Sequence, residues 1–203
     1  MTILVKALDT ITKVYESAST VRSGKGKFTT VNELTDQVPA ARPGTLEAAV
    51  QILLRMRPIP TSIDKVLSEE DKGAVLAGLF SVQAGLRLAM ARHNVPYEIP
   101  GSLVVPLSME YMDGSLTVNG LIQYDKLIII DDTLSTGGTL VSLIKAARGF
   151  DCHIEEVRVV IEKLGYGGRE RLAAEGVDVH AGLGILVDDF GEISVRERLQ
   201  CPV

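Results

Sequence analysis

Residues 127–140 read LIIIDDTLSTGGTL, and this stretch decides the fold class. Its first four residues are apolar and lead directly into two aspartates, Asp131 and Asp132. An unbroken aliphatic run is typical of a strand that is buried on both faces of a parallel sheet. The residues after the aspartates are small or hydroxylated, and they pass into a segment with helical apolar spacing. The stretch therefore predicts a buried strand, a polar loop and a helix, in that order.

The segments around this stretch continue the alternation of strand and helix. We expect strands or extended segments at residues 63–68, 101–107, 126–131, 154–163 and 177–187, and helices at 73–94, 137–150 and 168–176. Residues 108–115 have the composition of a loop. This alternation is typical of an α/β fold in which helices flank a parallel sheet. In such sheets ligands bind beyond the carboxyl ends of the strands, where the two aspartates fall.

The domain organisation predicted from this pattern is a single domain across residues 1–203. Residues 1–60 would contain two helices separated by an irregular segment, residues 23–39, and would form a small hood. Residues 61–203 would form the α/β core.

The composition narrows the classes of function. Hydrophobic residues make up 46% of the chain and charged residues 23%, as in an ordinary soluble globular protein. The formal net charge of -5 argues against a broad nucleic-acid-binding surface. The two cysteines, Cys152 and Cys201, are too far apart in sequence to indicate a zinc motif, and no signal peptide or membrane-spanning run is evident. We expect a cytoplasmic protein with neither nucleic acid nor membrane as a partner.

The polar loop has the chemistry of a ribose 5-phosphate site. Gly137 and Gly138 allow close approach of the backbone to a ligand, and the N–H groups at a helix start bind anions. Asp131 and Asp132 can accept hydrogen bonds from vicinal hydroxyls or support a divalent cation. The hydroxyl donors of the loop are Ser135, Thr136 and Thr139. Two alternatives remain: the Gly-Gly pair only begins a helix that the aspartates cap, or the aspartates form an acidic metal pair as in receiver domains.

The string LIIIDDTLSTGGT resembles the ribose-phosphate-binding signature of type I phosphoribosyltransferases. The resemblance implies that Asp131 and Asp132 are catalytic residues that hold the ribose hydroxyls and a Mg²⁺ ion. It also implies a homodimer that binds 5-phosphoribosyl-1-diphosphate (PRPP) and a purine base or nucleotide. The residues implied to hold the 5'-phosphate are Ser135, Thr136, Gly137, Gly138 and Thr139.

Other segments resemble the purine branch of this family. Residues 66–77, VLSEEDKGAVLA, resemble the pyrophosphate turn of purine-salvage members. Residues 28–39 and 116–121 resemble segments of archaeal hypoxanthine enzymes, and residues 159–172 resemble archaeal hypoxanthine and adenine members. The turn implies that substrate is also bound by Glu70, Lys72 and Gly73.

The identity of the base depends on two conflicting resemblances. Residues 106–111, PLSMEY, resemble the flexible loop of adenine phosphoribosyltransferases, which makes Glu110 the residue that handles a proton on the base. Lys163 occupies a region where a lysine contacts the base oxygen in 6-oxopurine enzymes, so it favours hypoxanthine or guanine. We give the loop slightly more weight, which favours adenine.

One departure from the family pattern concerns the cations that neutralise the leaving pyrophosphate. Residues 97–102, YEIPGS, keep the Pro-Gly of adenine-type enzymes but lack every cation around it, and no Lys or Arg occurs between His93 and Asp125. Lys72, Lys25, Lys27 or a bound Mg²⁺ could compensate. Two hypotheses follow: a purine phosphoribosyltransferase that forms a nucleoside monophosphate and pyrophosphate, or a diverged member. The diverged member would sense PRPP or a nucleotide, or would use another donor or acceptor.

Overall fold

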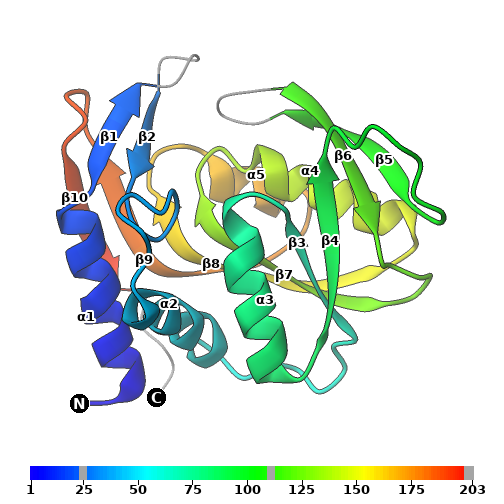
Figure 1. Ribbon diagram of the computed structural model, residues 1–203, viewed down its shortest axis with the longest axis horizontal. Helices are drawn as coiled ribbons and strands as arrows, with labels where there is room; N and C mark the ends of the chain where they lie inside the picture. The colour runs from blue at the N-terminus through cyan, green and yellow to red at the C-terminus, as the bar shows by residue number, and fades with distance from the viewer. Residues whose placement is uncertain (23–26, 109–112, 199–203) are drawn as a thin grey trace.

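The computed structural model describes residues 1–22, 27–108 and 113–198, and it places one large sheet between two layers of helices (Figure 1). The strands of the sheet, in spatial order, are β10 (Ile193–Arg198), β9 (Val179–Val187), β8 (His153–Lys163), β7 (Lys126–Leu134), β3 (Lys65–Glu69), β4 (Arg87–His93), β6 (Asp113–Asn119) and β5 (Leu103–Ser108). The five strands from β9 to β4 are mutually parallel, and antiparallel strands flank them at both edges. The predicted α/β class, with a parallel sheet flanked by helices, is confirmed.

Helices cover the two faces of the sheet and form two hydrophobic cores. One core joins the sheet to α1 (Ile3–Glu16), α2 (Pro43–Arg55) and α3 (Lys72–Ala84). The other joins it to α4 (Gly138–Gly149) and α5 (Gly168–Ala174). Ile128 and Ile130 face the first core, and Leu127 and Ile129 face the second, because successive side chains of a strand point to opposite faces. This arrangement explains why the four residues of β7 between the exposed Lys126 and Asp131 are all aliphatic.

The N-terminal segment contributes a hairpin as well as helices. Strands β1 (Ser19–Arg22) and β2 (Phe28–Val31) pair antiparallel within residues that we had expected to be partly irregular. The Thr20 hydroxyl donates a 2.8 Å hydrogen bond to the Gly191 carbonyl, which ties the hairpin to the β9–β10 turn beside it in Figure 1. Because α1 and α2 share a core with the sheet, no clear boundary separates residues 1–60 from the rest, and that division stays a prediction.

The expectation of one helix across residues 73–94 is wrong. Helix α3 ends at Ala84, because Gly85 adopts the left-handed conformation (φ 69°) and its N–H bonds the carbonyls of Ser81 and Val82. Residues 87–93 then form β4. The expected loop at residues 108–115 is wrong at its end, since β6 begins at Asp113.

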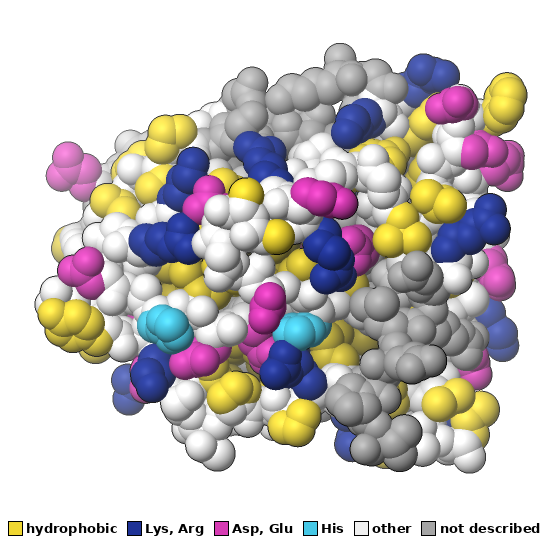
Figure 2. All heavy atoms as spheres, turned by 180° about the vertical axis from the view of Figure 1, so that it is seen from behind, with side chains coloured by type: hydrophobic (Ala, Val, Ile, Leu, Met, Phe, Trp, Pro, Cys, Tyr) yellow, Lys and Arg dark blue, Asp and Glu magenta, His cyan; other side chains and the backbone are white. Residues whose placement is uncertain are grey.

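Charged groups of both signs intermingle on the rear surface of the molecule (Figure 2). None of the helices within residues 1–22, 27–108 and 113–198 has the length and hydrophobicity that a membrane crossing requires.

Candidate functional site

The site lies where β7 leaves the sheet and α4 begins. A pocket of about 640 Å³, counting the open space at its mouth, is lined by the whole polar loop after β7. Gly137 precedes α4 with φ 74°, a conformation that favours glycine, and a Cβ there would meet the Gly168 carbonyl oxygen at 3.2 Å. The free N–H groups at the start of α4 therefore border the pocket and suit an anion. The predicted phosphate-binding residues that line it together are Ser135, Thr136, Gly137, Gly138 and Thr139.

The two aspartates line the same pocket and are almost completely buried. Asp131 Oδ1 accepts a 2.8 Å hydrogen bond from the Asp132 backbone N–H, and Asp132 Oδ2 accepts a 2.9 Å hydrogen bond from the Thr133 hydroxyl. Burial, and then the negative charges of Asp132 and Glu69, raise the pKa of Asp131 well above its ordinary value. Burial also raises the pKa of Asp132, although the nearby positive charge of Lys72 opposes the shift. The positive charge near Asp131 and Asp132 therefore does not balance the negative charge around them.

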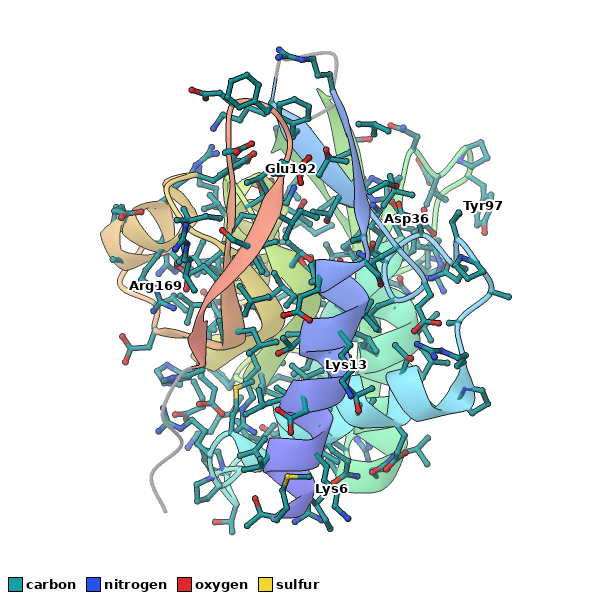
Figure 3. All side chains as sticks on the ribbon, turned by 90° about the vertical axis from the view of Figure 1, so that its left-hand side faces the viewer. Lys6, Lys13, Asp36, Tyr97, Arg169 and Glu192 are labelled. Atoms are coloured by element: carbon teal, nitrogen blue, oxygen red, sulfur yellow. The ribbon has the colours of Figure 1, made fainter. Side chains whose placement is uncertain are left out.

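The pyrophosphate turn packs against this pair. Lys72 lines the pocket, and its Nζ donates a 2.6 Å hydrogen bond to Asp36 Oδ1, which lies in the loop between β2 and α2 (Figure 3). Burial lowers the pKa of Lys72, but the hydrogen bond to Asp36 and the negative charges of Asp132, Asp36 and Asp71 together outweigh it, and the net shift is upward. Gly73 lies so close to Asp131 that a Cβ would meet Oδ1 at 2.7 Å. Glu70 does not line the pocket: its carboxylate accepts a 2.6 Å hydrogen bond from the His93 backbone N–H at the end of β4.

The β1–β2 hairpin, part of the predicted hood, borders the other side of the pocket. Thr29 and Thr30 of β2 line it, together with Lys163 at the end of β8. Lys163 is buried, and its Nζ donates a 3.2 Å hydrogen bond to the Phe28 carbonyl. The Tyr166 hydroxyl donates to the same oxygen at 3.2 Å, so β2 and the β8–α5 turn are joined at this point.

Other predicted residues lie elsewhere or outside the described part of the chain. Glu110 and Lys25 fall in the segments 109–112 and 23–26, which the structure does not describe. Lys27 Nζ lies 4.7 Å from the centre of the Tyr166 ring and does not line the pocket. Residues 97–102, where the family cations are missing, also do not line it.

Sequence reasoning missed several residues that line the pocket: Thr29, Thr30, Thr35, Glu69 and Thr133. Glu69 had a usable signal, because it directly precedes Glu70 at the end of an expected strand. The hood threonines had none, since only tertiary packing brings them to β7.

Comparisons with known proteins agree with this geometry, although no family model matches the sequence. The chain is 31% identical over 190 residues to a curated hypoxanthine/guanine phosphoribosyltransferase from Methanohalobium evestigatum, covering 94% of this chain and 96% of the relative. A relative of the same name from Methanothermobacter marburgensis is 32% identical over 191 residues, covering 94% and 97%.

Solved structures of similar fold are adenine phosphoribosyltransferases. That from Rhodothermus marinus superposes with a TM-score of 0.69 at 25% identity, covering 87% of this chain and 97% of that one. The enzyme from Giardia lamblia, complexed with 9-deazaadenine, gives a TM-score of 0.69 at 21% identity, covering 89% and 97%. Together with the two carboxylates and the glycine-rich loop that line one pocket, the likeness to these relatives shows that the chain belongs to the type I purine phosphoribosyltransferase family of glycosyltransferases.

Proposed function

We propose that the protein transfers the 5-phosphoribosyl group of PRPP to a ring nitrogen of a purine base. The bond from ribose C1 to pyrophosphate breaks, a C1–N bond forms, and the base loses the proton from that nitrogen. One observation carries the proposal: two buried carboxylates and a glycine-rich helix N-terminus line the same pocket. The carboxylates suit the ribose hydroxyls, and the loop suits the 5'-phosphate.

We propose Mg²⁺ as the cofactor, held through Asp131 and Asp132. No group of three His, Cys, Asp or Glu residues within residues 1–22, 27–108 and 113–198 forms a ready metal site. Mg²⁺, however, is commonly bound by one or two carboxylates together with substrate phosphates and water. The raised pKa values of the pair, which follow from burial and crowding of negative charge, suit this arrangement. When bound, the ion would neutralise charge on PRPP.

For the base, the described residues support a 6-oxopurine. Lys163 brings a cationic donor into the pocket, which suits the carbonyl oxygen of hypoxanthine or guanine. The curated relatives also carry the name hypoxanthine/guanine phosphoribosyltransferase. The slight preference for adenine depends on Glu110 and stays a prediction.

The decisive experiment measures pyrophosphate release from PRPP and Mg²⁺ with adenine, hypoxanthine, guanine and xanthine supplied separately. Turnover with one base supports the transfer reaction and identifies the acceptor. Absence of pyrophosphate release with all four bases, combined with tight binding of a nucleoside monophosphate, would favour the diverged sensor instead.

Replacing Lys163 with methionine should lower kcat/KM for hypoxanthine or guanine. The loss of a hydrogen bond from a charged donor predicts a decrease of about 10- to 100-fold. The decrease for adenine should be smaller, because adenine has no carbonyl oxygen. Lys27→Met is the matched control, since the Nζ atoms of Lys163 and Lys27 lie 5.3 and 4.7 Å from the centre of the Tyr166 ring, but Lys27 does not line the pocket. An equal decrease in kcat/KM for all purines would show that Lys163 does not recognise the base.

We also propose a homodimer that uses the outer face of α3. Val75, Leu79 and Val82 are 46%, 37% and 82% exposed, and their spacing places them on one stripe of the helix. The opposite side of α3, which carries Leu76 and Phe80, is buried in the first core. A helix that is apolar on both sides is expected to be covered on both sides, and a second copy would cover this stripe.

Val82→Glu should therefore convert a dimer to a monomer in light-scattering measurements of mass. The change places a charge within the proposed contact, while the fold tolerates it because Val82 is largely exposed. Ile122→Glu, at an exposed position in the β6–β7 connection, controls for the added charge. A monomeric wild-type protein, or a dimer that persists in Val82→Glu, would rule out this interface.

A further inference from the structure

A hydrogen-bonded pair of residues lies beside the predicted pyrophosphate turn. Glu69 ends β3 and His93 ends the neighbouring parallel strand β4. Glu69 Oε2 and His93 Nε2 are 2.6 Å apart, and the two side chains are 7% and 15% exposed. Glu69 lines the pocket together with Asp131 and Asp132, whereas His93 lies behind it. A third carboxylate is thus fixed at the site by a histidine.

The Glu69–His93 pair is important because acidic groups outnumber basic groups among the described residues that line the pocket. Among the described residues, three carboxylates line the pocket: Glu69, Asp131 and Asp132. The two cations among its lining residues in the described ranges are Lys72, which is already bonded to Asp36, and Lys163, which lies beneath the hood. PRPP brings a phosphate and a diphosphate. A bare carboxylate at Glu69 would repel the diphosphate at short range, where water screens charges weakly.

The surroundings of His93 favour its cationic form. The hydrogen bond to Glu69 raises the pKa of His93; partial burial opposes this shift, and the nearby charges of Glu70 and Asp71 add to it. The charged groups that shift the pKa of His93 are therefore acidic, and Arg92 Nε lies 4.0 Å from Glu70 Oε2. His93 Nδ1 is buried and has no hydrogen-bond partner among the residues that the structure describes.

We propose that His93 is a positioning residue for the transfer reaction, which as an imidazolium neutralises and orients Glu69 so that the diphosphate of PRPP can occupy the pocket. This inference rests on the proposed function. It also offers a local source of positive charge for a chain that lacks Lys and Arg between His93 and Asp125. The effect of His93 is exerted through Glu69 and concerns the diphosphate rather than the ribose 5-phosphate part.

The test compares His93→Gln, Glu69→Gln and the double variant by calorimetric titration with PRPP and, separately, with ribose 5-phosphate, both with Mg²⁺. His93→Gln leaves Glu69 unneutralised and should weaken PRPP binding at least about tenfold, with less than about a twofold effect on ribose 5-phosphate. The double variant removes the unpaired charge and should recover PRPP affinity to within about threefold of the wild type. His153→Gln is the matched control, because His153 also pairs with a glutamate, Glu155 at 3.6 Å, but is largely exposed and remote from the pocket.

A purely structural role gives a different pattern. Both ligands would then weaken together, the midpoint of thermal unfolding would fall in parallel, and the double variant would be no better than His93→Gln; that pattern would overturn the proposal. In steady-state assays the wild-type KM for PRPP should rise as pH increases through the raised pKa of His93, and this rise should disappear in the double variant. If the wild type binds PRPP but turns over none of the four bases, the proposed reaction fails while the titrations still decide the role of His93. Absence of PRPP binding by the wild type would overturn both.

Discussion

Changing Asp131 and Asp132 together to asparagine should abolish detectable binding of PRPP and of ribose 5-phosphate. In the proposed function each carboxylate accepts hydrogen bonds from the ribose hydroxyls, and a hydrogen bond to a charged group contributes about 1.5–3 kcal/mol. Loss of both predicts a decrease in affinity of roughly 100- to 10,000-fold, before any loss of Mg²⁺ is counted. Isothermal titration calorimetry measures this directly, and unchanged affinity would show that the ribose binds elsewhere.

The same double substitution should make the free protein more stable. Burial raises the pKa of both carboxyl groups, so the folded state binds protons more tightly than the unfolded state does. Stability therefore falls as pH rises from the unfolded pKa of an aspartate through the raised folded values. Asparagine removes this penalty while keeping an acceptor for the Asp132 backbone N–H. We expect a higher midpoint of thermal unfolding at pH 7 and a weaker dependence on pH between about 4 and 7.

A second pair of adjacent aspartates provides the control. Asp188 and Asp189 follow β9 but are exposed. Changing both to asparagine should alter neither ligand binding nor the unfolding midpoint appreciably. Equal destabilisation by both double variants would mean that the raised pKa values of Asp131 and Asp132 do not reflect a cost of burial.

Gly73→Ala should lower kcat/KM by about 10- to 100-fold with little change in fold. A Cβ at residue 73 would meet Asp131 Oδ1 at 2.7 Å and Ser68 Oγ at 2.8 Å, both closer than atoms normally approach. The Asp131 side chain must then shift, and in the proposed function this shift would misplace the ribose relative to the predicted pyrophosphate turn. The measurement is steady-state kinetics with PRPP varied, together with thermal unfolding.

Gly44→Ala separates this effect from helix propensity. Gly44 lies in the first turn of α2, and nothing lies within 4 Å of a Cβ built there. Its substitution should leave the kinetics unchanged. Wild-type activity of Gly73→Ala would mean that Asp131 can shift without consequence, and the close approach of the pyrophosphate turn would then have no catalytic importance.

The parts of the structure that the sequence predicted well are those encoded locally. The strand, loop and helix at residues 127–150 follow from an aliphatic run, a glycine pair and helical spacing within one short stretch. Helix α3 and strand β4 could not be separated by spacing, because residues 73–91 are apolar nearly throughout and fit both periodicities. Gly85 marked the boundary, but a glycine within a long apolar segment is also compatible with a continuous helix.

The residues of the glycine-rich loop could be predicted from the sequence, whereas other residues that line the pocket could not. The loop is contiguous in sequence, so its residues could be identified together. Glu69 and His93 are 24 residues apart and meet only because β3 and β4 are parallel neighbours. Thr29 and Thr30 reach the pocket from a hairpin whose strands are only four residues long. Contacts of this kind depend on tertiary packing, which spacing along one sequence does not report.

The hydrogen bonds that hold the β1–β2 hairpin in place limit the directions from which a ligand can reach the pocket. Three side chains, Thr20, Lys163 and Tyr166, join the β1–β2 hairpin to the second half of the chain through carbonyl oxygens. Lifting the hairpin would break all three bonds, at about 0.5–1.5 kcal/mol each for the neutral donors and more for the lysine. A hinged lid on this side is therefore disfavoured. We expect ligands to enter and leave on a side of the pocket that the β1–β2 hairpin does not cover.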